Sequence, residues 1–347
     1  MKKYCLLLSF ALLVLSRNIS AADLIWDGYL TAAYAQTNSE SSYRELVSDQ
    51  GSFADSRFGV HLATEVDTLW TLEAQFFAAG YEENYNLVLD WAFAAYEVSN
   101  QLQLKFGKLK YPNNLVSEYY DVGLAYPWIR PPHEFYGQEE LSTMVTSEAF
   151  NGVTAIFSKH NSSWDYLAQP FFGEISLEEG AGAISKLLGL KLTAAHDIAE
   201  LQLSVAQGRI NYEGHEYDEK KKRIVTFGTL SEWGNLVNYL EYAVSKISDE
   251  DEANTKVGYY TLGYHFGDTM PHVTFSKFDQ ENGWGQKSVI LGVKQMLNPS
   301  MALKFEFQRV TPEDNPETGA EMEAGLFEEA PESETVNVFT IAVDVVF

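Results

Sequence analysis

The sequence predicts an all-β protein: a sixteen-stranded antiparallel β-barrel that spans a membrane. Three observations carry this prediction: an N-terminal export signal, segments in which apolar and polar residues alternate, and connections that are short and long in turn. The chain has 347 residues, of which 46% are hydrophobic and 14% aromatic. This composition argues against disorder of the whole chain and allows one large domain.

The first 22 residues have the features of a signal peptide, which leaves a barrel domain over 23–347. Two lysines precede the apolar run LLLSFALLVL, and the segment ISAAD places small residues before a cleavage site at Asp23. A run of about ten residues is half of what a membrane helix needs. Cys5, the only cysteine, lies in this segment, so the mature chain is expected to have no disulfide. Export without cysteines is compatible with a bacterial envelope.

Apolar residues recur at every second position in the mature sequence, which is the period of a β-strand. In MALKFEFQ, for example, Met301, Leu303, Phe305 and Phe307 alternate with smaller or polar residues. An antiparallel sandwich with one solvated face would show the same period, so alternation alone leaves both folds open.

The connection lengths decide between the two folds. The sixteen strands that we expect cover 24–36, 56–67, 68–80, 86–99, 101–111, 149–159, 163–174, 185–196, 199–213, 222–233, 235–249, 255–267, 270–281, 286–297, 300–311 and 335–347. Tight turns join the members of successive pairs, and longer loops at 37–55, 81–86, 112–148, 175–184, 214–221, 250–254, 282–285 and 312–334 join the pairs. Outer-membrane barrels sort their connections in this way, with short periplasmic turns and longer extracellular loops.

Strand length and the C-terminus support a barrel in a membrane. The expected strands average about eleven or twelve residues, whereas strands of soluble proteins average about five or six. The chain ends with TVNVFTIAVDVVF, an alternating strand. Because lipid cannot satisfy an unpaired strand edge, this last strand is expected to pair with the first and close the ring. Phe347 would then lie in the aromatic girdle at the periplasmic rim.

Charge and motifs exclude several function classes. Without Lys2, Lys3 and Arg17, 21 basic residues remain against 49 acidic ones, a formal charge of −28 that argues against nucleic acid as a partner. No nucleophile elbow, zinc-protease motif or phosphate-binding loop is present, and the seven histidines lack metal-ligand spacing. We therefore expect no enzymatic activity, no metal and no cofactor.

Taken together, the signal peptide, the alternating strands, the long third loop and the terminal phenylalanine resemble a Gram-negative outer-membrane porin over the whole mature chain. The segment LKFGKLKYP also resembles the strand-to-loop junction of phosphate-selective porins. The resemblance implies a homotrimer in the outer membrane, in contact with lipid and lipopolysaccharide. It also implies that the C-terminal strand, ending in Phe347, is recognised by the outer-membrane assembly machinery.

Residues of the opposite parity to the bulky apolar ones are expected to line the lumen. The charged members of this set are Asp27, Arg57, His61, Glu65, Glu73, Lys105, Lys191, Lys294, Lys304, Glu306 and Asp344. Lys108 and Lys110, near the rim, stay unassigned.

The third loop, 112–148, is rich in aromatic residues and proline, which favours an ordered loop. By resemblance it folds into the barrel and narrows the channel; an extracellular cap is the alternative. Five of its residues would face the pore: Glu118, Asp121, Arg130, His133 and Glu134. Four aromatic residues would pack on the wall: Tyr119, Tyr120, Trp128 and Phe135.

The expected function is passive diffusion of small hydrophilic solutes and ions, with weak selectivity that favours cations. Lumenal charges set this preference, and a phosphate-selective channel would need more basic residues than this chain offers. The alternatives are a channel specific for one solute, such as an anion or phosphate, and an adhesion barrel plugged by its third loop. The last loop carries nine acidic residues and no basic one, which indicates a solvated surface or cation bridges to lipopolysaccharide.

Overall fold

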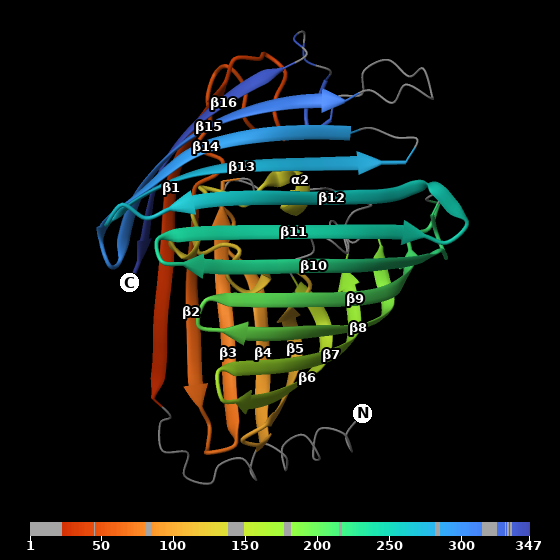
Figure 1. Cartoon of the computed structure of the whole chain (residues 1–347). Helices are drawn as coiled ribbons and strands as arrows, with labels where there is room; N and C mark the ends of the chain where they lie inside the picture. The colour runs from red at the N-terminus through yellow and green to blue at the C-terminus, as the bar shows by residue number, and fades with distance from the viewer. Residues whose placement is uncertain are drawn as a thin grey trace, which may run out of the picture.

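The computed structural model describes residues 23–44, 46–80, 85–137, 149–176, 182–214, 217–281, 285–313, 325–329, 331, 333 and 335–347. The expected signal peptide, 1–22, and much of the last long loop lie outside the described residues. Sixteen antiparallel strands form a closed barrel in which each strand pairs with its neighbours along the chain (Figure 1). The predicted fold class is confirmed.

The ring closes between β1 (Leu24–Thr37) and β16 (Val336–Val346), as predicted. The remaining strands are β2 (Arg57–Glu65), β3 (Trp70–Ala79), β4 (Val88–Ser99), β5 (Leu102–Lys110), β6 (Ala149–Asn161), β7 (Trp164–Ser176), β8 (Ala183–His196), β9 (Ala199–Asn211), β10 (Lys221–Trp233), β11 (Leu236–Ile247), β12 (Glu250–Tyr264), β13 (Thr269–Gln280), β14 (Gly285–Asn298) and β15 (Met301–Glu313). Loops 38–56 and 111–148 emerge at one end, which we call the long-loop end, and the opposite end is the short-turn end.

The largest difference from the predicted strands is at β12. The acidic stretch 250–254, expected as a loop, belongs to the strand, which begins at Glu250. Ile247 pairs with Glu250, and Asp249 takes a positive φ of 62° in the two-residue turn between them. Aspartate tolerates this conformation better than most residues, so the hairpin closes tightly despite its charge.

Phe347 lies at the short-turn end against the first strand. Its backbone exchanges two hydrogen bonds with Gly28, at 2.9 and 3.0 Å. Its ring lies 6.3 Å from the rings of Trp26 and Phe58, measured between centroids. A side chain at Gly28 would meet this ring, since an added Cβ would lie 2.7 Å from it. The terminal aromatic residue is thus part of the ring closure.

Side chains alternate between the two faces of the wall, as the sequence predicts. On β15, Phe305 and Phe307 point outward and are 39% and 45% exposed, whereas Lys304 and Glu306 point inward and are 1% and 9% exposed. Such a polar interior with an apolar exterior is typical of a barrel in lipid.

Three short helices belong to the third loop: η1 (Ser117–Tyr119), η2 (Gly123–Ala125) and α2 (His133–Tyr136). Among the described residues, no helix has the length and apolar character needed to cross a membrane.

Candidate functional site: the lumenal loop and its anchors

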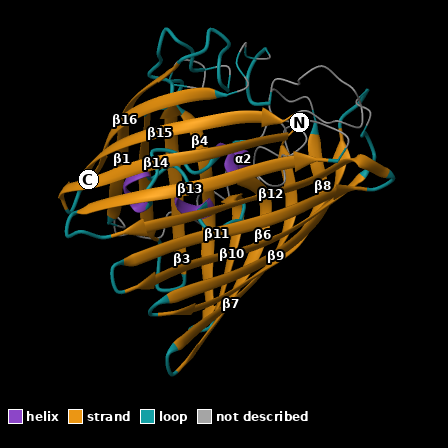
Figure 2. Cartoon of the chain, turned by 45° about the horizontal axis from the view of Figure 1, so that its top comes forward, coloured by secondary structure: helices purple, strands orange, loops and turns teal. Residues whose placement is uncertain are grey.

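The third loop folds into the barrel, as predicted. Figure 2 shows its short helices inside the ring of strands. Of residues 111–136, only Glu118 and Ala125 are exposed, whereas Tyr111, Trp128 and Phe135 are completely buried. We call residues 111–136 the lumenal loop.

The aromatic residues of this loop pack on strands β11 to β13. The ring of Trp128 lies 4.8 Å from that of Tyr239 and 5.6 Å from that of Tyr259. Its indole nitrogen donates to the hydroxyls of Thr261 and Thr274, at 3.2 and 2.8 Å. A buried tryptophan needs such a partner for its N–H. This contact therefore fixes both the apolar and the polar part of the side chain.

Asn113 anchors the start of the loop to β9 and β10. Its side chain donates to Thr226 at 3.1 Å and accepts from Ser204 at 3.0 Å, and its carbonyl accepts from Gln202 at 3.1 Å. All four residues are at most 2% exposed. Both the nitrogen and the oxygen of the side-chain amide are therefore hydrogen-bonded, which fixes its orientation.

Glu241 of β11 is a second anchor. One carboxylate oxygen accepts from the backbone N–H of Leu115 at 2.7 Å. The other accepts from the hydroxyls of Tyr136 and of Tyr259, the latter at 2.8 Å. Because Leu115 and Tyr136 come from the two ends of the lumenal loop, one buried carboxylate holds both ends.

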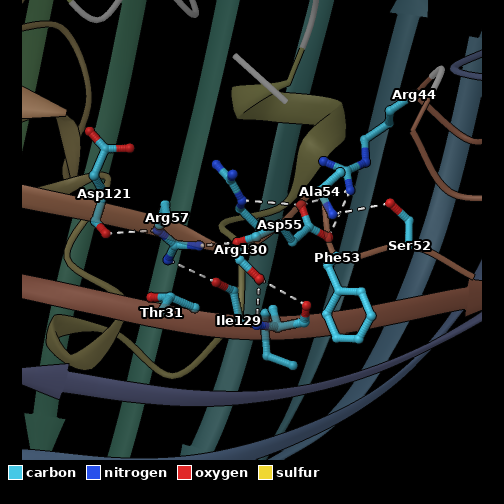
Figure 3. Close-up of polar contacts among 12 residues, drawn as sticks. Thr31, Arg44, Ser52, Phe53, Ala54, Asp55, Arg57, Asp121, Ile129 and Arg130 are labelled. Carbon is cyan, nitrogen blue, oxygen red and sulfur yellow. Dashed lines mark hydrogen bonds and ion pairs between the residues drawn. The ribbon is translucent and has the colours of Figure 1, made fainter. Parts of the chain in front are cut away.

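Arg57 of β2 holds the loop on the opposite wall (Figure 3). Its guanidinium donates to the carbonyls of Asp121 and Ile129, at 2.8 and 3.1 Å, and to the hydroxyl of Tyr126 at 2.8 Å. The side chain is 1% exposed. A planar guanidinium carries five N–H donors in a fixed fork, so one side chain binds acceptors that lie in several directions.

Basic residues of β14 and β15 bind the same part of the loop. Lys304 donates to the carbonyls of Gly123 and Trp128, both at 2.5 Å, and pairs with Asp344 at 2.9 Å. Lys294 donates to the carbonyl of Leu124 at 2.6 Å. These two lysines therefore hold loop carbonyls.

Carboxylates complete the contacts on this side. Glu306 accepts from the backbone of Ile129 at 2.8 Å. Glu134 of α2 accepts from Ser276 at 2.6 Å and from Gln286 at 2.7 Å, on β13 and β14. The helix is thereby fixed to the wall through its only acidic side chain.

Asp55, in the loop after β1, links that loop to the lumenal loop. It accepts two hydrogen bonds from Arg44 and lies 3.3 Å from Arg130 (Figure 3). Burial alone would raise the pKa of Asp55, but the two arginines hold it well below its usual range. Burial, together with the same arginines, lowers the pKa of the neighbouring His133. His133 is therefore neutral, and Asp55 ionised, at neutral pH.

The anchors show that the lumenal loop crosses the lumen from wall to wall. Asn113 is bound on β10 and Asp121 on β2, which are eight strands apart in the ring of sixteen. The loop packs closely on β10 to β16. The start of the loop also contacts β6 and β7, because the ring of Tyr111 lies 6.4 Å from that of Phe150 and 5.6 Å from that of Phe171. Glu118 is the one acidic residue of the loop that stays exposed.

Charged side chains of both signs also lie at inward positions that do not anchor the loop. His61 contacts Asp27 at 3.1 Å and Glu73 at 3.3 Å. Lys105 lies 4.6 Å from the ring centroid of Phe93. On the far side Glu200 interacts electrostatically with Lys191 and with Glu118 of the loop.

The predicted lumenal residues thus fall into two groups. Arg57, Lys294, Lys304, Glu306 and Asp344 bind the loop or one another, whereas the others do not anchor it: His61 contacts Glu73, Lys105 lies against Phe93, Lys191 interacts with Glu200, and Glu65 is exposed at the end of β2. Lys110, left unassigned from the sequence, pairs inside the barrel with Asp90 at 2.9 Å.

The predicted loop residues divide in the same way. Asp121, Arg130, His133 and Glu134, expected to face the pore, are between 0% and 8% exposed, and only Glu118 is exposed. Asp121 and Glu134 contact the wall, whereas Arg130 and His133 lie beside Asp55 of the loop after β1. Tyr120, Trp128 and Phe135 are buried against the wall, as expected, and Tyr119 is partly buried.

Three further residues of the site were not singled out from the sequence. The sequence could have indicated Glu241, because it is a lone carboxylate at an inward position between Tyr239 and Ala243. No sequence pattern indicates Asn113 or Asp55, since each lies in a loop whose path is set by contacts with residues distant in the sequence.

The chain was compared with known proteins. No family model and no curated protein sequence matches it. Among solved structures, an anion-selective porin from Comamonas acidovorans aligns with a TM-score of 0.63 and 12% identity, over 94% of this chain and 100% of that one.

Two further solved structures are similar. OmpF of Salmonella typhi, in complex with daunomycin, aligns with a TM-score of 0.62 and 13% identity, over 94% of this chain and 98% of that one. The trimer form of OmpT, an outer membrane protein of Vibrio cholerae, aligns with a TM-score of 0.60 and 12% identity, over 94% of this chain and 100% of that one. The fold is that of an outer-membrane barrel with a lumenal loop. More narrowly, it is the fold of Gram-negative outer-membrane porins, and the chain is porin-like.

Proposed function

We propose that this protein is an outer-membrane diffusion channel for small hydrophilic solutes and ions. The observation that carries the proposal is the position of the lumenal loop. It is fixed to β2 and to β9 to β16 and keeps Glu118 exposed, as the constriction of a water-filled channel would require. The likeness in fold to porins and channels supports it.

The charges beside the passage favour cations weakly. Glu118 and Glu200 interact with each other and Glu200 with Lys191, while Glu73 and Lys105 are inward charges of opposite sign on β3 and β5. Mixed charges orient passing water and set only a modest preference between ions. An anion-specific channel needs basic residues that are free to bind anions, whereas Arg57, Lys294 and Lys304 bind loop carbonyls. We therefore favour a general channel over a phosphate-specific one.

A reversal-potential measurement across a planar bilayer under a KCl gradient tests this assignment. We expect a small cation preference in the wild type and a smaller one in Glu118→Gln, because that variant removes the exposed acid of the loop. Asp279→Asn, which removes an exposed acid on the outward face of β13, serves as control and should behave like the wild type. Strong anion preference in the wild type would overturn the proposal.

One observation favours the second candidate, a barrel plugged by its loop and acting through its surface. The lumenal loop is bound on both walls and almost completely buried, so the passage beside it is narrow. Insertions into a bilayer without conductance would support the plug.

The channel proposal includes three further parts: residues 1–22 direct export, the assembly machinery recognises Phe347, and the protein forms a homotrimer. Conductance steps in multiples of three would support the trimer.

A further inference from the structure

Basic side chains form a row on the outward face of the barrel, near the long-loop end. The row, which we call the basic belt, consists of Lys186, Arg209, Lys221, Arg223, Lys246, Lys256, Lys277, Lys287 and Arg309, all exposed. Arg223 shares its parity with Val225 and Phe227, which are 40% and 42% exposed on the outer wall. The belt therefore lies directly above the apolar band of the barrel.

The belt covers one side of the barrel. All nine residues belong to strands β8 to β15. In the described part of β1 to β7 and β16, the only comparable outward residue is Lys108, whose ammonium donates to the carbonyl of Leu89 at 2.7 Å. Nine basic residues on one side of a protein with a formal charge of −25 are a marked departure from its overall charge.

Residues of the belt face one another across strands. Arg223 lies opposite Lys246, Lys221 opposite Arg209, and Lys277 opposite Lys287. Like charges in such positions destabilise a sheet unless an anion lies between them.

Acidic side chains neutralise part of the belt only. Glu219 pairs with Arg209 at 2.7 Å, and Glu313 pairs with Lys277 and Lys287 at 3.0 and 2.7 Å. Asp279 lies at the same level on β13. Within the described residues, Arg223 and Lys246 form no ion pair. This pair is therefore the part of the belt whose positive charge the described acidic residues do not neutralise.

We propose that the basic belt binds the phosphate groups of the lipid that surrounds the barrel at its long-loop end, the phosphorylated headgroup of lipopolysaccharide. This proposal rests on the proposed position in the outer membrane. Arginine and lysine at the edge of the apolar layer extend toward the headgroups and bind phosphate strongly. The apolar residues below the belt, such as Phe227 and Tyr242, would contact the acyl chains of the same lipid.

Binding of lipid A to the purified protein in detergent tests the proposal. The probes are bis-phosphorylated lipid A and lipid A without phosphate, and the variant is Arg223→Gln/Lys246→Gln. We expect the double variant to bind the phosphorylated lipid about 30-fold more weakly, because each basic residue near a charged lipid surface contributes about a factor of five. The control Lys108→Gln/Lys159→Gln removes two outward charges outside the belt and should bind like the wild type.

Three results would overturn the proposal: equal affinity of the double variant and the wild type, equal affinity for the lipid without phosphate, or full competition by millimolar inorganic phosphate. Conductance in phosphatidylcholine bilayers is measured in parallel on the same proteins. A conducting double variant with weakened lipid binding supports both proposals, and a silent wild type that binds lipid A would refute the channel alone.

Discussion

Tyr136, at the end of the lumenal loop, donates its hydroxyl proton to Glu241 of β11, and the same carboxylate accepts the backbone N–H of Leu115 from the start of the loop. The two ends of a segment of more than twenty residues therefore meet on one side chain. This arrangement makes the position of the loop depend on Glu241.

Replacing Glu241 by alanine should loosen the loop. Three buried donors, on Leu115, Tyr136 and Tyr259, would lose their acceptor, at a cost of about 1–3 kcal/mol each. We expect a noisier and larger single-channel current. Asp279→Ala removes an exposed acid on the outward face of β13 and should leave the current unchanged. A quiet, wild-type current in Glu241→Ala would contradict this role.

Replacing Arg57 by alanine should release the other side of the loop. The carbonyls of Asp121 and Ile129 lose their donor, and a hydrogen bond to a charged group contributes about 1.5–3 kcal/mol. A cysteine at Val122, which is partly buried, should then react faster with a thiol reagent, while one at the exposed Ala125 should react at the same rate in both backgrounds. An unchanged rate at position 122 would show that Arg57 is not needed to hold the loop.

Acidification should lower the stability of the folded protein through His133. The pKa of His133 is lowered by burial in the folded protein, so the unfolded chain binds the proton first as the pH falls. Stability is therefore present above pH 6.5 and decreases below it, by about 1.4 kcal/mol per pH unit.

The pKa of Asp55 is held low, so Asp55 stays ionised in this window and does not contribute to the change. The measurement is the free energy of unfolding in detergent between pH 7.5 and 5, with His133→Asn as the reference. Parallel profiles for the two proteins would refute the role of His133.

Phe347→Ala should slow the pairing of the first and last strands that closes the barrel. The ring of Phe347 packs on Trp26 and Phe58, and its loss removes aromatic contacts of about 0.5–1.5 kcal/mol each. We expect a lower yield of folded barrel in detergent, seen as heat-modifiable migration in a gel. Phe339→Ala, at an outward position of the same strand, is the matched control. Equal yields for the two variants would show that the terminal position has no special role.

The sequence predicts the wall of this barrel because its signals are local. Alternation in MALKFEFQ assigned Lys304 and Glu306 to the interior, and the strand ends mostly agree to within two or three residues. The anchors of the loop depend on contacts over long separations, such as the 177 residues between Ile129 and Glu306. Composition indicated an ordered loop, but it could not tell that Asp121 and Glu134 would bind the wall while Glu118 stays exposed.

For the same reason, the sequence could not distinguish the inward residues that bind the loop from the inward residues that do not. Arg57 and His61 have the same parity on the same strand, yet the loop covers Arg57 and leaves His61 partly exposed. Only the path of the loop distinguishes them.

Single-channel recording of Glu118→Cys in a planar bilayer tests the central claim most directly. We expect stepwise conductance that falls when a negatively charged thiol reagent is added, because the reagent would react at the exposed position 118 beside the conducting passage. Silent insertions, or a current that the reagent leaves unchanged while labelling is complete, would contradict a channel beside the loop.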